Sequence, residues 1–425
     1  MALLWLGGGW RWRAATLRGS PQGPSSPLDQ AGRPHWQQHL ARNLAVIPPE
    51  RRRQLRSFEP QGPGLLAAAQ ASGPALLDLA SNDYLGLSHH PALVAAAQMA
   101  AAKAGVGAGA SRLITGSRPG HTELEQALAA WLGRARVLLF PSGFQANLAA
   151  VGALADRHSL VLADRLIHHS LLVGVRASGA ELQRFRHNDL HHLEQQLAAA
   201  RQTNGQRRLL VLSESLFSME GTSPDVAQLQ DLCQRHGAAL LLDEAHALGV
   251  LGPGGRGLGH GHPDLALISG TFGKAFGSGG AFLAGDQLIG EWLLQSAGAF
   301  RYTTALAPPL AAGALAGLRQ IQAHPQTGEA LLDRARRWRD GMEAAGWPRP
   351  AGEGPILPLV IGDDQETLER QRHLEAAGLL TAAIRPPTVP AGTARLRLVL
   401  RHDLPAGSLK RLIRALGSPP QPPRS

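Results

Sequence analysis

The chain has 425 residues, of which 44% are hydrophobic, so it can bury a large core and is not a disordered polyelectrolyte. Its formal charge is +10, but the basic residues are scattered, aromatic residues make up 4%, and the longest basic run is Arg51–Arg53. A nucleic-acid-binding protein would gather its basic residues on one face or in a tail. The composition therefore argues against nucleic acid as a partner and favours phosphates, coenzyme A or an acidic carrier.

The first 30 residues begin with a short apolar run that Gly7–Gly9 and Arg11 interrupt. A signal peptide needs a longer apolar stretch and a small-residue cleavage site. We therefore expect a disordered leader over residues 1–30 and an N-terminal segment over residues 31–80. No other run approaches the length that a membrane-spanning helix needs, so we expect no membrane partner. The single cysteine, Cys233, rules out a disulfide within the chain and is consistent with a cytoplasmic protein.

From about Gly120 onward, apolar runs rich in valine and leucine alternate with segments of helical spacing. The apolar runs predict strands at 136–140, 159–164, 207–215, 239–245 and 265–271. The segments with helical spacing predict helices at 121–133, 143–155, 190–202 and 226–237. Because the apolar runs have few polar positions, they indicate a mostly parallel sheet that helices cover on both faces. We place this large α/β domain at residues 81–314.

A smaller pattern follows the large domain. It predicts strands at 355–363 and 394–400 and helices at 366–379 and 408–416. We interpret residues 315–418 as a smaller C-terminal α+β domain and the proline-rich residues 419–425 as a frayed tail.

Ligands of open α/β sheets bind at the carboxyl ends of the strands, so the residues that follow predicted strands are the candidates for function. This rule selects Ser142–Phe144, Asp164–Ser170, Ser218, Asp243–His246 and Thr271–Lys274. Ser142 and Gly143 begin a predicted helix, whose backbone N–H groups can hold a phosphate. Asp243 follows a very apolar strand and is expected to meet a cation or several hydrogen-bond donors, although a helix N-cap would also explain it. The histidine pairs 168–169 and 191–192 lack metal-ligand spacing, so we expect no metal site.

Lys274 lies in the glycine-rich stretch GTFGKAFGSGG, whereas the other two lysines, Lys103 and Lys410, lie in helical patterns. A lysine whose amine is partly desolvated can form a Schiff base with a carbonyl group. Such a lysine, an acid for a pyridinium nitrogen and a phosphate-binding turn together predict pyridoxal 5′-phosphate as the cofactor. A P-loop is the rival interpretation, but the spacing differs and Ala275 stands where that motif needs a hydroxyl group.

Several motifs in order along the chain resemble those of the α-oxoamine synthases. They include SNDYLGLSHHP, SRLITGSRPGHTELE, FPSGFQANLA, ADRLIHHSLL, FSMEG, LLDEAH, SGTFGKAFGSGGA and IRPPTVPAGTARLRL. The resemblance covers about residues 35–417. It implies a fold-type-I pyridoxal-phosphate transferase, with a large, mostly parallel sheet domain and a smaller C-terminal α+β domain. Two departures, Glu220 for an aspartate and Ala247 for a glycine that many members carry, remove no reacting group.

The resemblance also implies a role for each matched residue. Lys274 would be the Schiff-base lysine and the base for proton transfer, and Asp243 would pair with the pyridine nitrogen. His168 would stack on the cofactor ring, while His246 and Ser218 would contact the region of its phenolic oxygen. The other matches are Gly143, Phe144 and Thr271 for the phosphate, Asn82 and Arg385 for the carboxylate of the substrate amino acid, and Arg56 and Thr388 for further substrate contacts, with Arg56 on the acyl side.

Within this family the motifs favour the activity of biotin synthesis. That activity condenses L-alanine with a pimeloyl thioester of coenzyme A or acyl carrier protein and releases carbon dioxide and the free thiol carrier. The resemblance further implies a homodimer. The alternatives are the sister activities of 5-aminolevulinate synthase, 2-amino-3-oxobutyrate coenzyme A ligase and serine palmitoyltransferase. A basic binding protein without activity is an alternative of another class, but it gives no reason to keep Asp243, His246 and Lys274.

Overall fold

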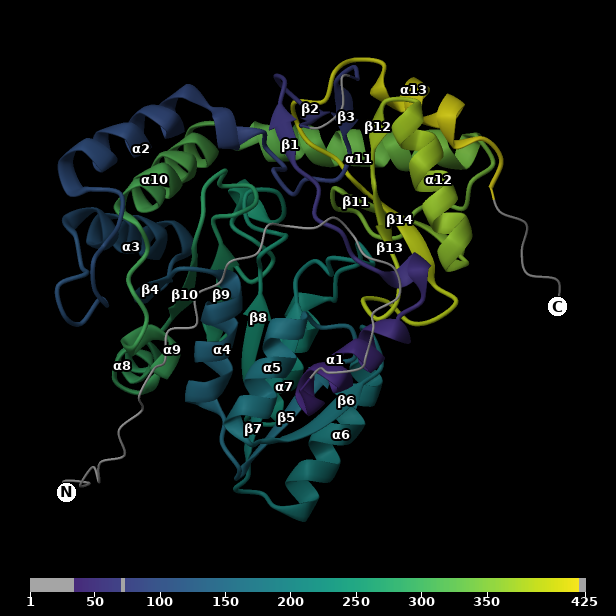
Figure 1. Cartoon of the computed structure of the whole chain (residues 1–425). Coiled ribbons are helices and arrows are strands. Elements are labelled where there is room, and N and C mark those ends of the chain that lie inside the picture. Colours follow the sequence, from purple (N-terminus) through teal and green to yellow (C-terminus); the bar gives the residue numbers. More distant parts are fainter. Residues whose placement is uncertain (1–33, 70–72, 420–425) are drawn as a thin grey trace. The chain divides into compact units, whose positions relative to one another are not determined.

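The computed structural model describes residues 34–69 and 73–419 (Figure 1). It forms two compact units that divide between Arg53 and Gln54. The first unit contains helix α1 (His35–Ala45) and the 3₁₀ turn η1 (Pro49–Arg51). The expected leader at residues 1–30 lies outside the described residues. In the described part of the chain, no helix is long and apolar enough to cross a membrane.

A seven-stranded sheet forms the centre of the second unit (Figure 1). Its strand order is β4-β10-β9-β8-β7-β5-β6. All neighbouring strands run parallel except β10, which is antiparallel to both β4 and β9. The strands are β4 (Arg136–Phe140), β5 (Ser159–Asp164), β6 (Glu181–Phe185), β7 (Arg208–Glu214), β8 (Ala239–Asp243), β9 (Leu267–Thr271) and β10 (Ala281–Gly285).

Helices cover both faces of this sheet, because alternate residues of each strand point to opposite sides. In β4, Val137 and Leu139 belong to one buried apolar cluster, whereas Leu138 and Phe140 belong to a second one. The first cluster includes residues of α3 (Pro119–Leu132), α6 (Leu190–Thr203), α7 (Val226–Arg235), α10 (Pro308–Ala323) and α11 (Gln326–Ala344). The second includes residues of α4 (Gly143–Leu154), α5 (His169–Ser178), α8 (Gln287–Ser296) and α9 (Gly298–Arg301). Helix α2 (Pro91–Ala104) lies beside α10 (Figure 1).

Two smaller sheets complete the unit. One is antiparallel in the order β11-β14-β13, and the other has the order β1-β2-β3-β12, in which β3 and β12 are parallel. The N-terminal strands of this unit therefore pair with a strand near the C-terminus. The elements are β1 (Phe58–Pro60), β2 (Leu65–Ala68), β3 (Leu76–Asp78), β11 (Ile356–Gly362), β12 (Leu379–Leu380), β13 (Ala382–Ile384), β14 (Ala394–Val399), the helices α12 (Asp364–Ala376) and α13 (Ser408–Leu416), and the 3₁₀ turns η2 (Leu87–His89) and η3 (Pro253–Gly255).

The structure confirms the α/β class and all the strands and helices predicted above to within a few residues. Two strands of the large sheet, β6 and β10, were not predicted. The expected division into a large and a small domain near residue 315 stays a prediction, and helix α10 spans that position.

Candidate active site

Two carboxylates lie side by side at the carboxyl edge of the large sheet. Glu214 ends β7 and Asp243 ends β8, and the two residues are partners in the parallel pairing of these strands. Both side chains are buried. Burial raises the pKa of Glu214 well above its ordinary value, and the neighbouring charge of Asp243 raises it further. Glu214 therefore favours the protonated form.

A chain of hydrogen bonds connects Asp243 to His168. Asn147 Nδ2 donates to Asp243 Oδ2 at 2.8 Å and to Ser170 Oγ at 2.9 Å. The Ser170 hydroxyl in turn lies 2.7 Å from His168 Nδ1. Burial lowers the pKa of His168 and the charge of Asp243 opposes that effect, yet the residue remains open to solvent. The structure thus brings together a buried carboxyl group and an accessible imidazole whose pKa is lowered.

Lys274 lies in the connection from β9 to β10, residues 272–280. This connection is too short for a parallel crossover, so the chain reverses and β10 pairs antiparallel. The backbone N–H of Phe272 donates to the carbonyl of Gly280 at 2.9 Å, and that of Gly277 donates to the carbonyl of Lys274. The turn therefore fixes the lysine at the carboxyl edge of the sheet, near Asp243.

The amine of Lys274 is a stronger nucleophile than an ordinary lysine at neutral pH. Its pKa falls from 10.5 to about 8, mainly through burial, and Arg397 lowers it further. The negative charge of Asp243 opposes this effect. A substantial fraction of the amine is therefore unprotonated near pH 8.

His246 lies near Lys274 and contacts Tyr84. The Tyr84 hydroxyl lies 2.5 Å from His246 Nδ1, and both residues are buried. Burial lowers the pKa of His246 well below its ordinary value, with Lys274 and Arg397 as the next causes. His246 is therefore neutral at physiological pH and can take part in hydrogen bonds without adding a charge.

Arg397 joins two more of the expected residues to this group. It lies on β14 and is buried, with 5% of its surface exposed. Its Nε donates to the carbonyl of Ser218 at 2.5 Å, and its Nη2 donates to Asn82 Oδ1 at 2.9 Å. The sequence analysis did not select Arg397. Arg397 thus contacts Asn82 and lies close enough to Lys274 to lower the pKa of its amine.

The residues expected at a phosphate also lie together. Gly143 begins α4 after the N-cap Ser142, whose hydroxyl accepts from Gln145 N. A Cβ atom on Gly143 would lie 3.8 Å from the Cβ of Thr271. Phe144 follows Gly143 and is exposed. The first turn of α4 therefore presents its N-terminus, with its partial positive charge, beside Thr271.

Arg385, Thr388 and Arg56 are the three remaining expected residues. Arg385 is buried directly after β13, and its carbonyl accepts a hydrogen bond from the backbone N–H of Thr388 at 3.1 Å. Thr388 is exposed. Arg56 forms a two-point ion pair with Glu375 of α12, one contact being 2.8 Å. These contacts do not connect any of the three residues to Lys274.

Sequence reasoning missed four residues of this group. Glu214 follows the same rule as Asp243, an acid at the end of an apolar run, and that signal was available. Asn147 and Tyr84 lie within motifs but look like ordinary helix or loop residues, whereas Ser170 was selected within Asp164–Ser170 without a role. The omitted residues are Glu214, Asn147, Tyr84 and Arg397.

The sequence pattern of one protein family, Aminotransferase class I and II, matches residues 74–416. The chain belongs to this family. Among similar proteins of the class I and II family, the 8-amino-7-oxononanoate synthase of Anaeromyxobacter sp. (strain K) is 42% identical over 377 residues, covering 87% of this chain and 94% of that protein. The enzyme of the same name from Cellvibrio japonicus is 39% identical over 389 residues, covering 89% and 96%.

Solved structures of the class I and II family agree with the fold. Serine palmitoyltransferase of Sphingomonas wittichii matches with a TM-score of 0.81 and 25% identity, covering 90% of this chain and 94% of that one. A serine palmitoyltransferase with pyridoxal phosphate bound as the internal aldimine has a TM-score of 0.80 and 27% identity, covering 85% and 91%. The 8-amino-7-oxononanoate synthase of Francisella tularensis has a TM-score of 0.70 and 25% identity, covering 80% and 96%. The fold is that of the fold-type-I pyridoxal-phosphate enzymes, and the chain is a pyridoxal-phosphate-dependent acyltransferase.

The residues of the site fit this cofactor. Asp243 offers a buried carboxylate, and the amine of Lys274 has a lowered pKa. A helix N-terminus lies beside the hydroxyl-bearing Thr271. Lys274, His168 and Phe144 all keep exposed surface, whereas Asp243 and His246 are buried below them. A carboxyl group, an amine and an anion site form the donor set that a pyridine ring with an aldehyde and a phosphate requires.

Proposed function

We propose that this protein condenses L-alanine with a pimeloyl thioester to give 8-amino-7-oxononanoate, carbon dioxide and the free thiol carrier, a step of biotin synthesis. The grouping of Lys274, Asp243, His168 and His246 at the carboxyl edge of the sheet carries the proposal. The relatives named 8-amino-7-oxononanoate synthase support the choice among related reactions. The structural neighbours named serine palmitoyltransferase are less similar in sequence, at 25% and 27%.

Five residues would hold the ring of the cofactor. Lys274 would bind the aldehyde carbon through its amine, and Asp243 would keep a proton on the ring nitrogen through its carboxylate. His168 would cover one ring face, while His246 would contact the oxygen substituent together with Ser218. The bound cofactor supplies an electron sink for the negative charge that develops on the Cα of the amino acid. Asp243 matters most for that sink, because a fixed negative charge in a buried place stabilises the protonated nitrogen.

Gly143, Phe144 and Thr271 would hold the phosphate. The N-terminus of α4 attracts an anion through its unpaired N–H groups and its dipole. The hydroxyl of Thr271 lies in the adjacent turn, where it donates to the carbonyl of Gly280 at 3.0 Å and accepts from Gly273 N at 3.2 Å. This arrangement would fix the distance from the phosphate to Lys274.

The carboxylate of the amino acid would bind beside Asn82. The sequence resemblance assigns Arg385 as the cation that binds this carboxylate, whereas the contact between Asn82 and Arg397 supports Arg397 in that role. A guanidinium can hold a carboxylate through two hydrogen bonds. Arg56 and Thr388 would contact the acyl part of the substrate, for which Arg56 would first have to exchange its ion pair with Glu375.

Lys274 would also move the proton at the Cα of the amino acid. With its amine free, Lys274 would be a base of pKa near 8 at the carboxyl edge of the sheet. A base with a pKa close to the working pH transfers protons efficiently in both directions. The buried His246 and Tyr84 beside it exclude water from that side.

The carrier of the acyl group, the homodimer and the cytoplasmic location stay predictions. The charge of +10 attracts both coenzyme A and an acidic carrier protein, so it does not distinguish between them.

The test compares substrates on the purified enzyme with bound cofactor. L-Alanine, glycine and serine are each combined with pimeloyl, succinyl, acetyl and palmitoyl thioesters, and the products are identified by mass. We expect L-alanine with the pimeloyl donor to react fastest. A preference for glycine with succinyl or acetyl donors, or for serine with palmitoyl donors, would contradict the proposal and assign a sister activity.

A further inference from the structure

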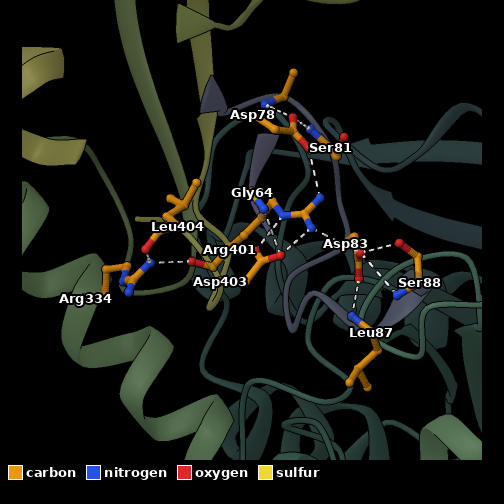
Figure 2. Close-up of polar contacts among 11 residues, drawn as sticks. Gly64, Asp78, Ser81, Asp83, Leu87, Ser88, Arg334, Arg401, Asp403 and Leu404 are labelled. Carbon is orange, nitrogen blue, oxygen red and sulfur yellow. Dashed lines mark hydrogen bonds and ion pairs between the residues drawn. The ribbon is translucent and has the colours of Figure 1, made fainter. Parts of the chain in front are cut away.

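A second group of charges surrounds Arg401, just beyond the end of β14 (Figure 2). The guanidinium of Arg401 is buried, and three carboxylates approach it. Asp403 accepts from Nε and from Nη2 at 2.8 Å each, and Asp78 accepts from Nη1 at 2.9 Å. Asp83 pairs with Nη2 at 3.4 Å. We refer to Arg401, Asp78, Asp83 and Asp403 as the Arg401 cluster.

Two carboxylates of the Arg401 cluster also hold the backbone of segment 78–88 (Figure 2). Asp78 lies at the start of this segment and Asp83 lies in its middle, and each accepts hydrogen bonds from backbone N–H groups that follow it. The donors to Asp78 are Ala80 and Ser81, at 3.1 and 3.0 Å, and the donors to Asp83 are Leu87 and Ser88, at 2.9 and 3.3 Å. Arg401 therefore holds segment 78–88 through Asp78 and Asp83, which belong to that segment and accept hydrogen bonds from its backbone.

The segment also approaches the third carboxylate closely. Gly86 has a φ of 69°, and a Cβ atom at this position would lie 2.7 Å from Cγ of Asp403. Only a glycine allows this approach. The backbone N–H of His402 further donates to the carbonyl of Tyr84 at 2.7 Å. Segment 78–88 is thus fixed against residues 401–403 by side chains and backbone together.

Segment 78–88 carries the two side chains that reach the active site from this direction. Asn82 accepts the hydrogen bond of Arg397, and Tyr84 contacts His246. Both lie between Asp78 and the 3₁₀ turn η2. A shift of the segment would therefore move Asn82 and Tyr84 together.

We propose that Arg401 is a positioning residue for the substrate amino acid: by holding Asp78, Asp83 and Asp403, it keeps Asn82 and Tyr84 facing Arg397 and His246. This inference rests on the proposed function, which assigns Asn82 to the substrate carboxylate. Its physical basis is the shape of the guanidinium, whose rigid fork of donors serves several carboxylates at once. An ammonium group in its place keeps the charge but has no fixed planar fork.

The experiment uses Arg401→Lys, because removing the charge would leave three carboxylates uncompensated in a buried place. Binding of L-alanine to the enzyme with bound cofactor is titrated from the change in cofactor absorbance, without thioester. We expect the Kd for L-alanine to rise about tenfold or more, while kcat at saturating L-alanine changes little, since small displacements of binding groups have effects of this size. Hydrogen exchange of peptides from segment 78–88 should become faster.

The matched control is Arg201→Lys. Arg201 of α6 also uses its guanidinium as a multiple donor, to the carbonyls of Gly205, Arg207, His236 and Gly237, which lie in the connections after α6 and after α7. We expect Arg201→Lys to lower the Tm without changing the Kd for L-alanine. A Kd that is unchanged in Arg401→Lys, with only a lower Tm, would overturn the inference and leave Arg401 as a stabilising residue.

Two further outcomes separate this inference from the proposed function. If the unmodified enzyme does not bind L-alanine, the proposed function is wrong, whereas unchanged exchange of segment 78–88 in Arg401→Lys contradicts only the positioning role. If Arg401→Lys does not fold, Asp83→Asn takes its place, because it keeps an acceptor for Leu87 but removes one charge facing Arg401. The same rise in Kd is expected, and its absence would contradict the inference.

Discussion

Lys274 differs from the other two lysines by its burial and its carboxylate neighbours, which leave its pKa at about 8. Borohydride reduction of the enzyme with bound cofactor should therefore attach the cofactor to Lys274, as peptide mapping by mass would show. The rate at which the apoprotein takes up pyridoxal phosphate should rise as the pH increases toward 8, because only the neutral amine reacts. Label on Lys103 or Lys410 would contradict the assignment.

Asp243 is the only charge assigned to the ring nitrogen. Asp243→Asn should lower kcat by about a thousandfold or more, because the protonated nitrogen loses its fixed partner while the shape is kept. Asp164→Asn is the matched control, since Asp164 also ends a parallel strand and is buried, but it bonds to His187 at 3.0 Å. A near-normal kcat in Asp243→Asn, measured with saturating cofactor, would contradict the role of Asp243.

The two arginines proposed for the substrate carboxylate can be separated by kinetics. Arg397 contacts Asn82, whereas Arg385 lies directly after β13. Arg397→Lys should raise the KM for L-alanine about tenfold or more, because the two-point carboxylate contact is lost. Arg385→Lys should have the smaller effect. The reverse order of KM values would favour the assignment by sequence resemblance.

The sequence singled out the residues that we propose to react, but not the residues that contact them. Lys274 and Asp243 stand out because a charged residue directly after an apolar run is costly without a partner. Arg397 gives no such signal, since an arginine that alternates with leucine in a strand usually faces solvent. Here Arg397 instead donates a hydrogen bond to the carbonyl of Ser218, in the turn that packs on this side of β14. Only the folded chain brings β14 and this turn together.

At the scale of an element, one buried carboxyl group holds the loop after β8. Glu244 accepts hydrogen bonds from the backbone N–H groups of Leu258 at 3.2 Å and Gly259 at 2.5 Å. A Cβ atom at Gly257, where φ is 84°, would lie 2.4 Å from Oε2 of Glu244. Burial raises the pKa of Glu244 from 4.5 to about 7. The loop therefore contains an acid that folding keeps protonated.

This shift predicts how stability depends on pH. Between pH 4.5 and 7 the folded protein binds more protons at Glu244 than the unfolded chain, so this contribution to stability falls as the pH rises. The loss amounts to about 3 kcal/mol by pH 8. In urea unfolding, Glu244→Gln should gain stability relative to the unmodified protein between pH 5 and pH 8. Glu123→Gln, at an exposed glutamate that pairs with Arg319, is the control. Parallel pH profiles for Glu244→Gln and the unmodified protein would contradict this prediction.

The two strands that were not predicted lack the signal of the others. The predicted strands of the large sheet are buried at nearly every position, which produces a continuous apolar run. In strand β6 only Phe185 is buried, so its sequence lacks that run. Strand β10 is buried at every position and is as long as β4, but it follows a glycine-rich turn, and its sequence AFLAG is rich in alanine and glycine and looks like a loop. The exposure of β6 and the small residues of β10 therefore explain the two omissions.

At the scale of the whole molecule, pairing between distant segments could not be predicted. Leu77 of β3 pairs with Leu379 of β12, which the sequence gives no reason to place together. The Arg401 cluster similarly joins Asp78 and Asp83 to residues more than 300 positions away. The α/β class follows from local sequence patterns, whereas these contacts join segments that are far apart in the sequence and meet only in the folded chain.

A surface of exposed apolar residues supports the expected homodimer. Val106 is 81% exposed, Ile114 75% and Tyr302 80%. The segments that carry them meet where the backbone N–H of Ala305 donates to the carbonyl of Ala110 at 2.9 Å. Next to Tyr302, Thr303 accepts a hydrogen bond from Gln145 in the first turn of α4, so this surface adjoins the proposed phosphate site. Side chains of this size gain free energy when a second copy covers them.

We therefore expect a mass of twice 44.9 kDa in solution by light scattering. Ile114→Asp should shift the mass toward that of one chain, because a charge buried at an apolar interface is costly. It should also weaken the binding of pyridoxal phosphate, since the surface adjoins Gln145 and the start of α4. Val360→Asp is the control, because Val360 is also exposed but lies on β11, which is not part of this surface. A single-chain mass for the unmodified protein, or an unchanged dimer in Ile114→Asp, would show that this surface does not join two copies.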